Sequence, residues 1–229
     1  MKLDQLIKKY KNISNYAYSS NETKFNSYEM GVYINKNNIK GSIVECGVAA
    51  AANFAFMMLG EKESNTGIKR KYWGFDSFQG IQLAGKKDNS QPGISGKIKH
   101  NVNVLEDDLL ISSGVTSVSK NQVIQNLQSW NLYDNVELIE GWIQKSLSND
   151  IVNDIGKISI LRLDMDIYAP TKFALEKLYS SVEIGGVIII DDWALLGART
   201  ACLEFFKEND INVNIKTIEN STPIYFIKE

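Results

Sequence analysis

The fold of this chain is decided by two short apolar runs, Ile158-Ser159-Ile160-Leu161-Arg162-Leu163-Asp164-Met165-Asp166 and Val187-Ile188-Ile189-Ile190-Asp191-Asp192. Each run is rich in β-branched residues and ends in a pair of carboxylates. Continuous apolar runs of this length are typical of strands buried on both faces of a parallel sheet. Carboxylates in such a setting need a cation, an arginine or water, and ligands of open α/β sheets bind at the carboxyl ends of the strands. The pairing therefore indicates a metal site.

From Gly41 onward, strand-like and helix-like segments alternate, which favours βαβ units in a doubly wound sheet. We expect an α/β fold, Rossmann-like, with a mostly parallel seven-stranded sheet and a C-terminal antiparallel hairpin. Gly185-Gly186 is interpreted as the turn into the fifth strand. The predicted strands are Ser42–Cys46, Lys71–Phe75, Val136–Ile139, Ile158–Leu163 and Val187–Ile190, with Val213–Ile218 and Pro223–Lys228 as the hairpin. The predicted helices are Leu3–Tyr10, Ala50–Gly60, Lys120–Leu127, Gln144–Ile151, Thr171–Ser181 and Thr200–Asn209.

Two segments do not follow this alternation of strands and helices. Residues 1–40 are predicted to form an N-terminal helical and polar segment. This segment, whose residues 12–26 are rich in Asn and Ser, is expected to be loosely tethered and to pack over the ligand site or over a partner subunit in a homodimer. Residues 41–229 are expected to form the main domain. Within that domain, residues 81–119 have few periodic apolar positions, which is typical of a lid, with flexible decoration as the alternative.

The composition excludes several classes of function. The formal net charge of -2 over 229 residues offers no electrostatic footprint for nucleic acid. No apolar run approaches the length of a membrane span, and no secretory signal is recognisable, so we expect a cytoplasmic protein. Cys46 and Cys202 lack metal-ligand spacing, and Cys46 is interpreted as a buried reduced thiol.

The ends of the first two predicted strands carry candidate cofactor residues. Glu45-Cys46-Gly47 is followed by small residues, so that the backbone can approach a ligand at the first βα turn. Only one Gly is present there, which argues against a pyrophosphate-binding fingerprint and leaves a plain tight turn as the alternative. Asp76 closes the second strand, where an acidic side chain commonly holds a ribose. The alternative is that Asp76 caps the following turn.

The four aspartates are the candidate metal ligands. Asp164 and Asp166 are two residues apart and would face the same way in an extended chain. Asp191 and Asp192 come where the chain turns, which can bring both toward the crevice. Oxygen ligands suit Mg²⁺, with Mn²⁺ and Ca²⁺ as alternatives, far better than zinc. The structural alternative is that Asp192 caps a helix and that Asp166 pairs with Arg162, Lys172 or Arg199.

These motifs together resemble the macrocin O-methyltransferase (TylF-type) family. The resemblance rests on Val44-Glu45-Cys46-Gly47-Val48, Gly74-Phe75-Asp76-Ser77-Phe78-Gln79-Gly80, Leu161-Arg162-Leu163-Asp164-Met165-Asp166-Ile167-Tyr168-Ala169-Pro170-Thr171 and Ile189-Ile190-Asp191-Asp192. It implies a class I methyltransferase fold. It also implies an enzyme that uses S-adenosylmethionine and Mg²⁺ to methylate a sugar hydroxyl.

The resemblance also implies roles for individual residues. Asp164, Asp191 and Asp192 would be the metal ligands, with Asp164 catalytic and at the cofactor as well. Asp166 would be the general base, a role it could exchange with a ligand. The cofactor would contact a further set of residues: Glu45, Gly47, Asp76, Ser77 and Trp142. The chain departs from the family at Ala50-Ala51-Ala52, where Arg-Gly-Gly is usual, and at Ala198, where Cys is common.

The acceptor and two rival functions stay open at this point. The acceptor would be a small sugar-containing molecule: a sugar nucleotide, a surface glycan precursor, a glycosylated natural product or a phosphorylated metabolite. One rival is a nicotinamide-dependent sugar oxidoreductase, because Tyr168 and Lys172 have the Tyr-x-x-x-Lys spacing. Pro170 between them argues against a continuous helix there. The other rival is a non-catalytic nucleotide-binding module.

Overall fold

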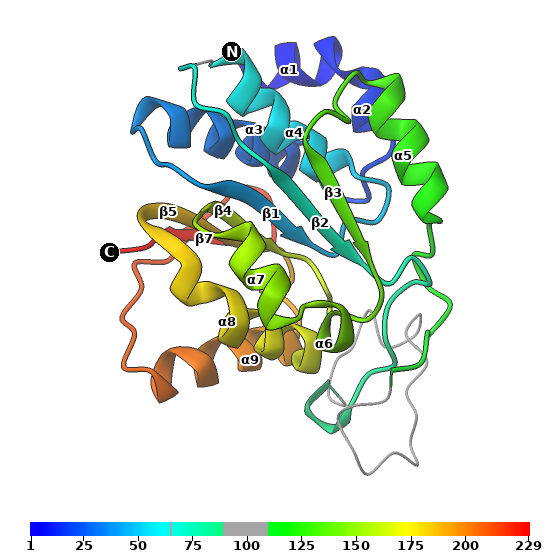
Figure 1. Cartoon of the computed structure of the whole chain (residues 1–229), viewed down its shortest axis with the longest axis vertical. Helices are drawn as coiled ribbons and strands as arrows, with labels where there is room; N and C mark the ends of the chain where they lie inside the picture. The colour runs from blue at the N-terminus through cyan, green and yellow to red at the C-terminus, as the bar shows by residue number, and fades with distance from the viewer. Residues whose placement is uncertain (65, 89–109) are drawn as a thin grey trace.

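A computed structural model describes residues 1–64, 66–88 and 110–229 of the chain. In this part, a seven-stranded sheet has the order β3-β2-β1-β4-β5-β7-β6 (Figure 1). The first five strands are parallel, and β7 runs antiparallel to both β5 and β6. The expected parallel sheet with a C-terminal hairpin is confirmed. The strands are β1 (Ser42–Cys46), β2 (Tyr72–Asp76), β3 (Val136–Glu140), β4 (Ile158–Leu163), β5 (Val182–Ile190), β6 (Lys216–Thr217) and β7 (Ile224–Ile227).

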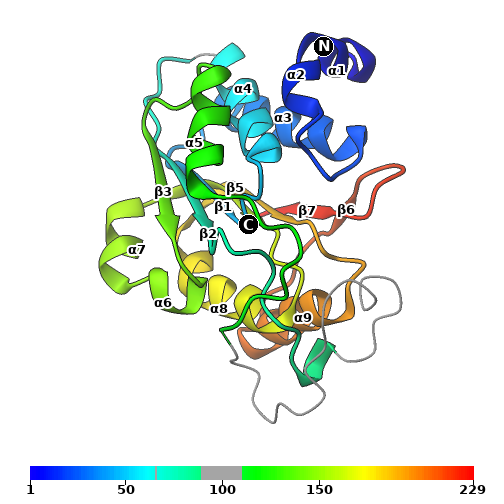
Figure 2. The same cartoon turned by 90° about the vertical axis from the view of Figure 1, so that its right-hand side faces the viewer.

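Helices cover both faces of the sheet and make three layers (Figures 1 and 2). Alternate strand residues face opposite layers: Ile43 and Ile160 pack with α1 to α5, whereas Val44 and Leu161 pack with α6 to α9. The helices are α1 (Leu3–Lys9), α2 (Lys11–Ser14), α3 (Asn21–Lys36), α4 (Ala52–Glu63), α5 (Lys120–Ser129), α6 (Ile143–Ser146), α7 (Asn149–Ile155), α8 (Tyr168–Leu178) and α9 (Leu196–Glu208), with 3-10 turns η1 (Lys86–Asp88) and η2 (Tyr179–Ser181).

The chain changes layers between β1 and its neighbour β4. The helix that follows β1 packs on one face and the helix that follows β4 packs on the other. In doubly wound sheets this reversal of strand order opens a crevice at the carboxyl ends of the two strands, where ligands bind. The fold therefore places the crevice at the end of the strand that carries Asp164.

The N-terminal segment differs from the expectation of a loose tether. Residues 21–36 form α3, which begins after Ser20, whose hydroxyl accepts a hydrogen bond from the Thr23 N–H at 3.1 Å. Gly31 of α3 meets Gly60 of α4 so closely that a Cβ on Gly31 would lie 2.2 Å from the Met57 carbonyl oxygen. The sequence of this segment shows no helical pattern of apolar residues, because the side chains that α3 buries include polar ones such as those of Asn26 and Ser27.

Other boundaries also differ. β5 begins at Val182, so Gly185-Gly186 lies inside the strand rather than in a turn before it, at a shift in the register with β4. The Gly185 N–H pairs with the Lys228 carbonyl at 2.7 Å. The helix expected over 144–151 is split into α6 and α7, because Ser148 caps a new helix. The first arm of the hairpin shortens to β6.

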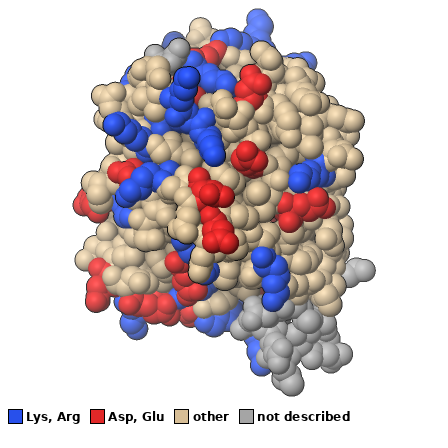
Figure 3. All heavy atoms as spheres, viewed as in Figure 1, with Lys and Arg blue, Asp and Glu red and all other residues tan. Residues whose placement is uncertain are grey.

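The face shown in Figure 3 carries both acidic and basic side chains, with neutral ones between them, so neither sign of charge covers it. In the described part of the chain, no helix combines the length and the apolar character that crossing a membrane would require.

Candidate functional site

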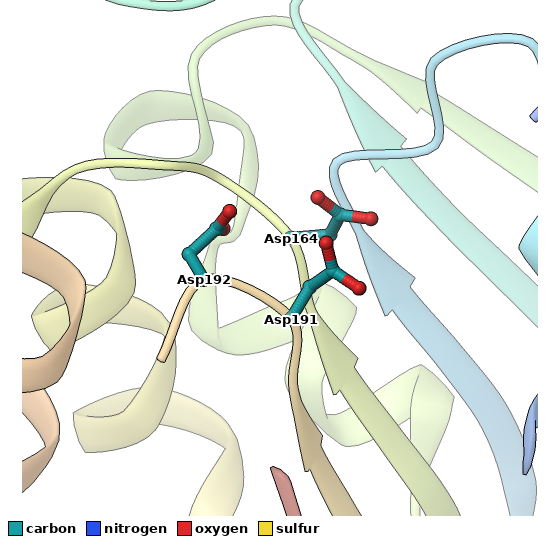
Figure 4. A group of neighbouring side chains, drawn as sticks. All are labelled: Asp164, Asp191 and Asp192. Carbon is teal, nitrogen blue, oxygen red and sulfur yellow. The ribbon is translucent and has the colours of Figure 1, made fainter. Parts of the chain in front are cut away.

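Three parallel strands end side by side and bring three aspartates together. The Asp164 N–H donates to the Cys46 carbonyl at 2.8 Å, and the Asp191 N–H donates to the Leu163 carbonyl at 2.9 Å. These bonds extend the pairing of β4 with β1 and of β5 with β4 by one residue beyond the ends of β4 and β5. One carboxylate oxygen from each of Asp164, Asp191 and Asp192 lies within 4.8 Å of the others, and the three side chains converge in Figure 4. The predicted carboxylate cluster thus exists in the structure.

Arg162 lies under this cluster and is completely buried. Its Nη2 donates to Asp164 Oδ2 at 3.1 Å and to Asp191 Oδ1, and its Nε lies 2.9 Å from Glu45 Oε1. A planar guanidinium can bridge several carboxylates because its donors point in different directions. Asp164 and Asp191 each keep a second carboxylate oxygen that Arg162 does not contact. Arg162 therefore positions two of the three aspartates.

The cluster contains more acid than one arginine can neutralise. Burial, followed by repulsion from Asp191 that Arg162 offsets only in part, raises the pKa of Asp164 well above its ordinary value. Burial, followed by repulsion from Asp166, does the same to the pKa of Asp192. Burial also raises the pKa of Glu45 to about 8. Electrostatics therefore favour an additional positive charge at this place.

Asp166 occupies a strained position beside the cluster. Its φ of 66° lies in the left-handed region, which Asp tolerates better than most residues. The Asp166 N–H donates to Asp192 Oδ2 at 2.7 Å, and this bond holds the turn. Burial, and then repulsion from Asp191, raises the pKa of its carboxyl to about 7. The pairing of Asp166 with Arg162 considered from the sequence is not formed, because Arg162 contacts other carboxylates.

Gly47 is required where β1 meets the end of β4. Its φ is +90°, and a Cβ there would lie 1.7 Å from the Asp164 carbonyl oxygen. Two of the four residues that follow adopt left-handed conformations as well, with φ of 45° at Ala49 and 71° at Ala51. Left-handed alanine is strained because its Cβ crowds the backbone. The turn in which the chain departs from the family pattern is therefore strained.

Asp76 holds that turn from the neighbouring strand. Its Oδ2 accepts from the Val48 and Ala49 N–H groups, both at 2.9 Å, and its Oδ1 accepts from the Phe78 N–H at 2.7 Å. The capping bond to the following turn is thus present. An oxygen with one hydrogen bond can still accept another, so the ribose role of Asp76 stays a prediction.

Two adjoining pockets open at this edge of the sheet. The first, which we call the slot, is lined by Gly47, Asp76, Ser77, Trp142 and other residues. The second, which we call the acidic pocket, is lined by Glu45, the three clustered aspartates and Tyr16 to Ser19. Asp164 and Asp166 line both. Of the predicted cofactor residues, Glu45 lies in the acidic pocket rather than in the slot.

Ser77 and Trp142 line the slot in different ways. The Ser77 hydroxyl donates to the Gly80 carbonyl at 2.9 Å and accepts from the Gln79 N–H at 3.1 Å, so it is engaged in its own turn. Trp142 lies directly before α6. The N–H of the residue before it, Gly141, donates to the Asp76 carbonyl at 2.9 Å. That bond joins the ends of β2 and β3 and places the indole at the slot.

The segment expected to be a lid begins and ends beside the slot. The Ile81 N–H donates to the Val115 carbonyl at 2.9 Å, and the Leu83 N–H donates to the Ile111 carbonyl at 2.8 Å, so its two ends pair. Residues 89–109, which include His100, lie outside the described residues. The lid stays a prediction.

Tyr168 and Lys172, whose spacing suggested an oxidoreductase, make their contacts away from the two pockets. α8 begins at Tyr168, so Pro170 falls in the first turn, where proline is tolerated, and the expected break in the helix is wrong. Tyr168 OH nevertheless donates to Glu204 of α9, and Lys172 Nζ donates to Glu208 of α9. Neither side chain lines the slot or the acidic pocket.

Sequence reasoning missed three candidate residues at this site. Arg162 was considered only as a partner of Asp166, although an arginine in the middle of an apolar strand signals a buried charge network. Tyr16 and Tyr18 lie in a stretch that has no periodicity, so no sequence signal points to their place at the acidic pocket.

The comparison with protein families agrees with this geometry. The family model described as macrocin O-methyltransferase (TylF) matches residues 25–228. The chain belongs to this family. Among its relatives, the demethyldecarbamoylnovobiocin O-methyltransferase of Streptomyces niveus is 30% identical over 185 residues, which cover 80% of this chain and 64% of that protein. The chain thus spans less than two thirds of that relative.

Solved structures of O-methyltransferases have the same architecture. The O-methyltransferase NovP superposes with a TM-score of 0.72 at 27% identity, over 91% of this chain and 80% of that one. The calicheamicin methyltransferase CalS11 superposes with a TM-score of 0.68 at 17% identity, over 89% of this chain and 78% of that one. The second likeness concerns the fold alone. The class I methyltransferase fold implied by the sequence motifs is confirmed.

Proposed function

We propose that this TylF-family protein transfers a methyl group from S-adenosylmethionine to a hydroxyl of a small sugar-containing acceptor, with the help of a divalent cation. The observation that carries the proposal is the three-aspartate cluster, which adjoins the slot through Asp164 and Asp166. Such an arrangement supports a reaction between a nucleoside cofactor on one side and a chelated acceptor on the other.

The residues of the slot fit the nucleoside part of the cofactor. Asp76 offers a carboxylate with remaining acceptor capacity, and Trp142 offers a flat apolar surface for a base. Gly47 allows close approach of the backbone. When bound there, the cofactor would supply an electrophilic methyl group.

The donor set of the cluster fits a hard cation. Asp164, Asp191 and Asp192 offer only oxygen, which Mg²⁺ and Ca²⁺ prefer. Opposite ligands around Mg²⁺ lie about 4.2 Å apart and those around Ca²⁺ about 4.8 Å apart, by doubling the usual metal–oxygen distances. The three oxygens lie within 4.8 Å of one another, a separation that one Ca²⁺ can span, and they would have to move slightly closer together to hold Mg²⁺. The ion would supply Lewis-acid polarisation of an acceptor oxygen.

Asp166 is the proposed general base. A sugar hydroxyl is protonated at neutral pH, so a group must accept its proton as the new C–O bond forms. The pKa of about 7 at Asp166 suits that task, because the best base titrates near the working pH. A positioned base contributes typically ~10²–10⁴-fold to the rate.

Asp191→Asn tests the metal role at a candidate ligand that lines the acidic pocket but not the slot. We expect loss of methyl transfer to a glycoside panel, loss of Mn²⁺ binding measured by electron paramagnetic resonance, and affinity for S-adenosylhomocysteine within about threefold of the parent protein. The control is Asp150→Asn, an exposed aspartate on α7, which should change none of these.

Calorimetric titration with S-adenosylhomocysteine and with NAD separates the transferase from the oxidoreductase. Binding of NAD in place of S-adenosylhomocysteine would refute the proposal. Full methyl transfer in EDTA would refute the metal role alone.

A further inference from the structure

The turn between β4 and α8 carries Asp166 in a strained conformation, with a φ of 66°. A residue other than glycine keeps such a conformation only when the surrounding structure enforces it. Within the turn, the Asp166 N–H donates to Asp192 Oδ2 at 2.7 Å and the Ile167 N–H donates to the Met165 carbonyl at 2.7 Å. Neither bond involves the next residue, Tyr168, where α8 begins. The way in which the turn runs into α8 therefore depends on other contacts.

Asp88 makes such a contact from a distant part of the chain. It is the last residue of η1, lies beside α9 and is 4% exposed. Its Oδ1 accepts a hydrogen bond from the Tyr168 N–H at 2.9 Å, and its Oδ2 accepts one from the Gly85 N–H at 2.9 Å. A carboxylate that accepts from an N–H in the first turn of a helix stabilises the beginning of that helix. Asp88 thus ties residues 85–88 to the first residue of α8.

An apolar contact lies beside this bond. Ile167, the residue between Asp166 and Tyr168, is 2% exposed and clusters with the buried Ala84. Ile81 packs against the same cluster. The segment that follows β2 therefore holds both residues after Asp166, one by its side chain and the other by its main chain.

The carboxyl of Asp88 also lies against α9, the helix that follows the other pair of aspartates. A Cβ on Gly197 of α9 would lie 1.6 Å from Asp88 Oδ1 and 3.1 Å from the Tyr168 nitrogen, so only glycine leaves room for this bond. Gly197 does not have a positive φ, so the close approach and not the backbone conformation requires glycine there. Asp88 thus joins the helix that follows Asp166 to the helix that follows Asp192.

We propose that Asp88 is a positioning residue, which keeps the Asp166 turn in its left-handed conformation and so sets where the Asp166 carboxyl lies beside the slot. The inference rests on the proposed function, in which Asp166 is the general base. Asp88 itself lines neither the slot nor the acidic pocket, so its effect on the reaction is transmitted by the turn. A displacement of about 1 Å in a reacting group can lower a rate about 10²-fold.

Hydrogen exchange followed by NMR tests the inference without any acceptor. The full chain is loaded with S-adenosylhomocysteine, and single amides are compared between the parent protein and Asp88→Ala. Loss of one bond alone would speed exchange only at Tyr168. We expect the amides of Asp166 and Ile167 to exchange about tenfold faster or more, because the turn opens, while the amides of α4 keep their rates. Unchanged exchange at Asp166 and Ile167, or an increase that α4 shares equally, overturns the inference.

Gly197→Ala disturbs the same bond without altering Asp88. Its new methyl group would occupy the place of Asp88 Oδ1, whereas alanine is otherwise the better helix former. We expect the same pattern of faster exchange in the turn. This variant decides the question if Asp88→Ala does not fold, and unchanged exchange in it overturns the inference.

Lys87→Met is the matched control. Lys87 Nζ donates to the Tyr168 hydroxyl at 2.8 Å and to Glu204 Oε2 at 2.7 Å, so it contacts the same first residue of α8 by the side chain and not by the main chain. Exchange at Asp166 should not change in this variant. An effect equal to that of Asp88→Ala would overturn the assignment to Asp88.

A double-mutant cycle separates positioning from a general loss of stability. Methyl transfer is measured with methyl α-L-rhamnopyranoside, methyl α-L-fucopyranoside and methyl β-D-glucopyranoside as acceptors. Asp88→Ala should lower kcat about 10²-fold and leave the KM for S-adenosylmethionine within about threefold of the parent value. When Asp166→Asn is already present, Asp88→Ala should lower kcat less than about threefold further, because the base that it positions is gone. Equal losses in the two backgrounds overturn the inference.

The same cycle distinguishes this inference from the proposed function. Full methyl transfer by Asp166→Asn would remove the general base and, with it, the proposed mechanism. Loss of transfer in Asp166→Asn together with an unchanged kcat in Asp88→Ala would remove only the inference about Asp88.

Discussion

Arg162→Met should strongly destabilise the protein and should make its stability depend on divalent cations. In the parent protein the guanidinium is completely buried and contacts Glu45, Asp164 and Asp191. Removing one partner of a buried ion pair typically costs ~3–5 kcal/mol, because the remaining charge is left without compensation. Here Asp164 and Asp191 lose the cation that they share, so we expect a loss at or above about 4 kcal/mol in EDTA. That is a large part of the ~5–15 kcal/mol that stabilises a typical domain.

Urea denaturation followed by circular dichroism measures this loss. Arg162→Lys keeps the charge but offers one compact ammonium in place of a planar fork, so we expect about half the loss and a variant that stays folded. Arg199→Met serves as the control for removal of an arginine. In Arg162→Met the carboxylates lack their cation. Added Mg²⁺ should therefore stabilise this variant more than the parent protein. A loss below about 1 kcal/mol, or equal stabilisation of both proteins by Mg²⁺, would refute the role given to Arg162.

Two further outcomes follow from the same region. Burial raises the pKa of Glu45 from 4.5 to about 8 in the folded protein, so the folded state retains a proton that the unfolded state has lost. The free energy of unfolding in EDTA should therefore fall as the pH rises from about 4.5 to 8, and Glu45→Gln should make this fall smaller by up to about 5 kcal/mol; an identical pH profile in the variant would contradict it. Ala49→Gly should raise the free energy of unfolding by about 0.5–1 kcal/mol, because it relieves the left-handed strain at a partly exposed residue. Ala17→Gly, at a residue without positive φ, should lower the free energy of unfolding instead. A lower free energy of unfolding in both variants would refute the strain argument.

The strands were predictable because each carries a local signal. Runs such as Ile158–Leu163 are apolar and β-branched, and the structure ends that strand at the predicted residue. The convergence of Asp164, Asp191 and Asp192 was also predictable, because parallel neighbours end at the same edge of a sheet. Helix α3 was not, because its buried face consists largely of polar and small residues that find partners on other elements.

The sequence by itself therefore determined the parallel sheet, the edge at which its acidic residues gather and the family to which the motifs point. Only the tertiary structure decided that Arg162 lies under the aspartates. The register of β1 against β4 places Glu45 opposite Arg162, and no pattern within either strand specifies that pairing. Likewise, the packing of α3 on α4 and the contact of Thr23 with Ser221 bring Tyr18 over the acidic pocket. Both features depend on contacts between residues far apart in the chain, whose free energy exists only once the elements have packed.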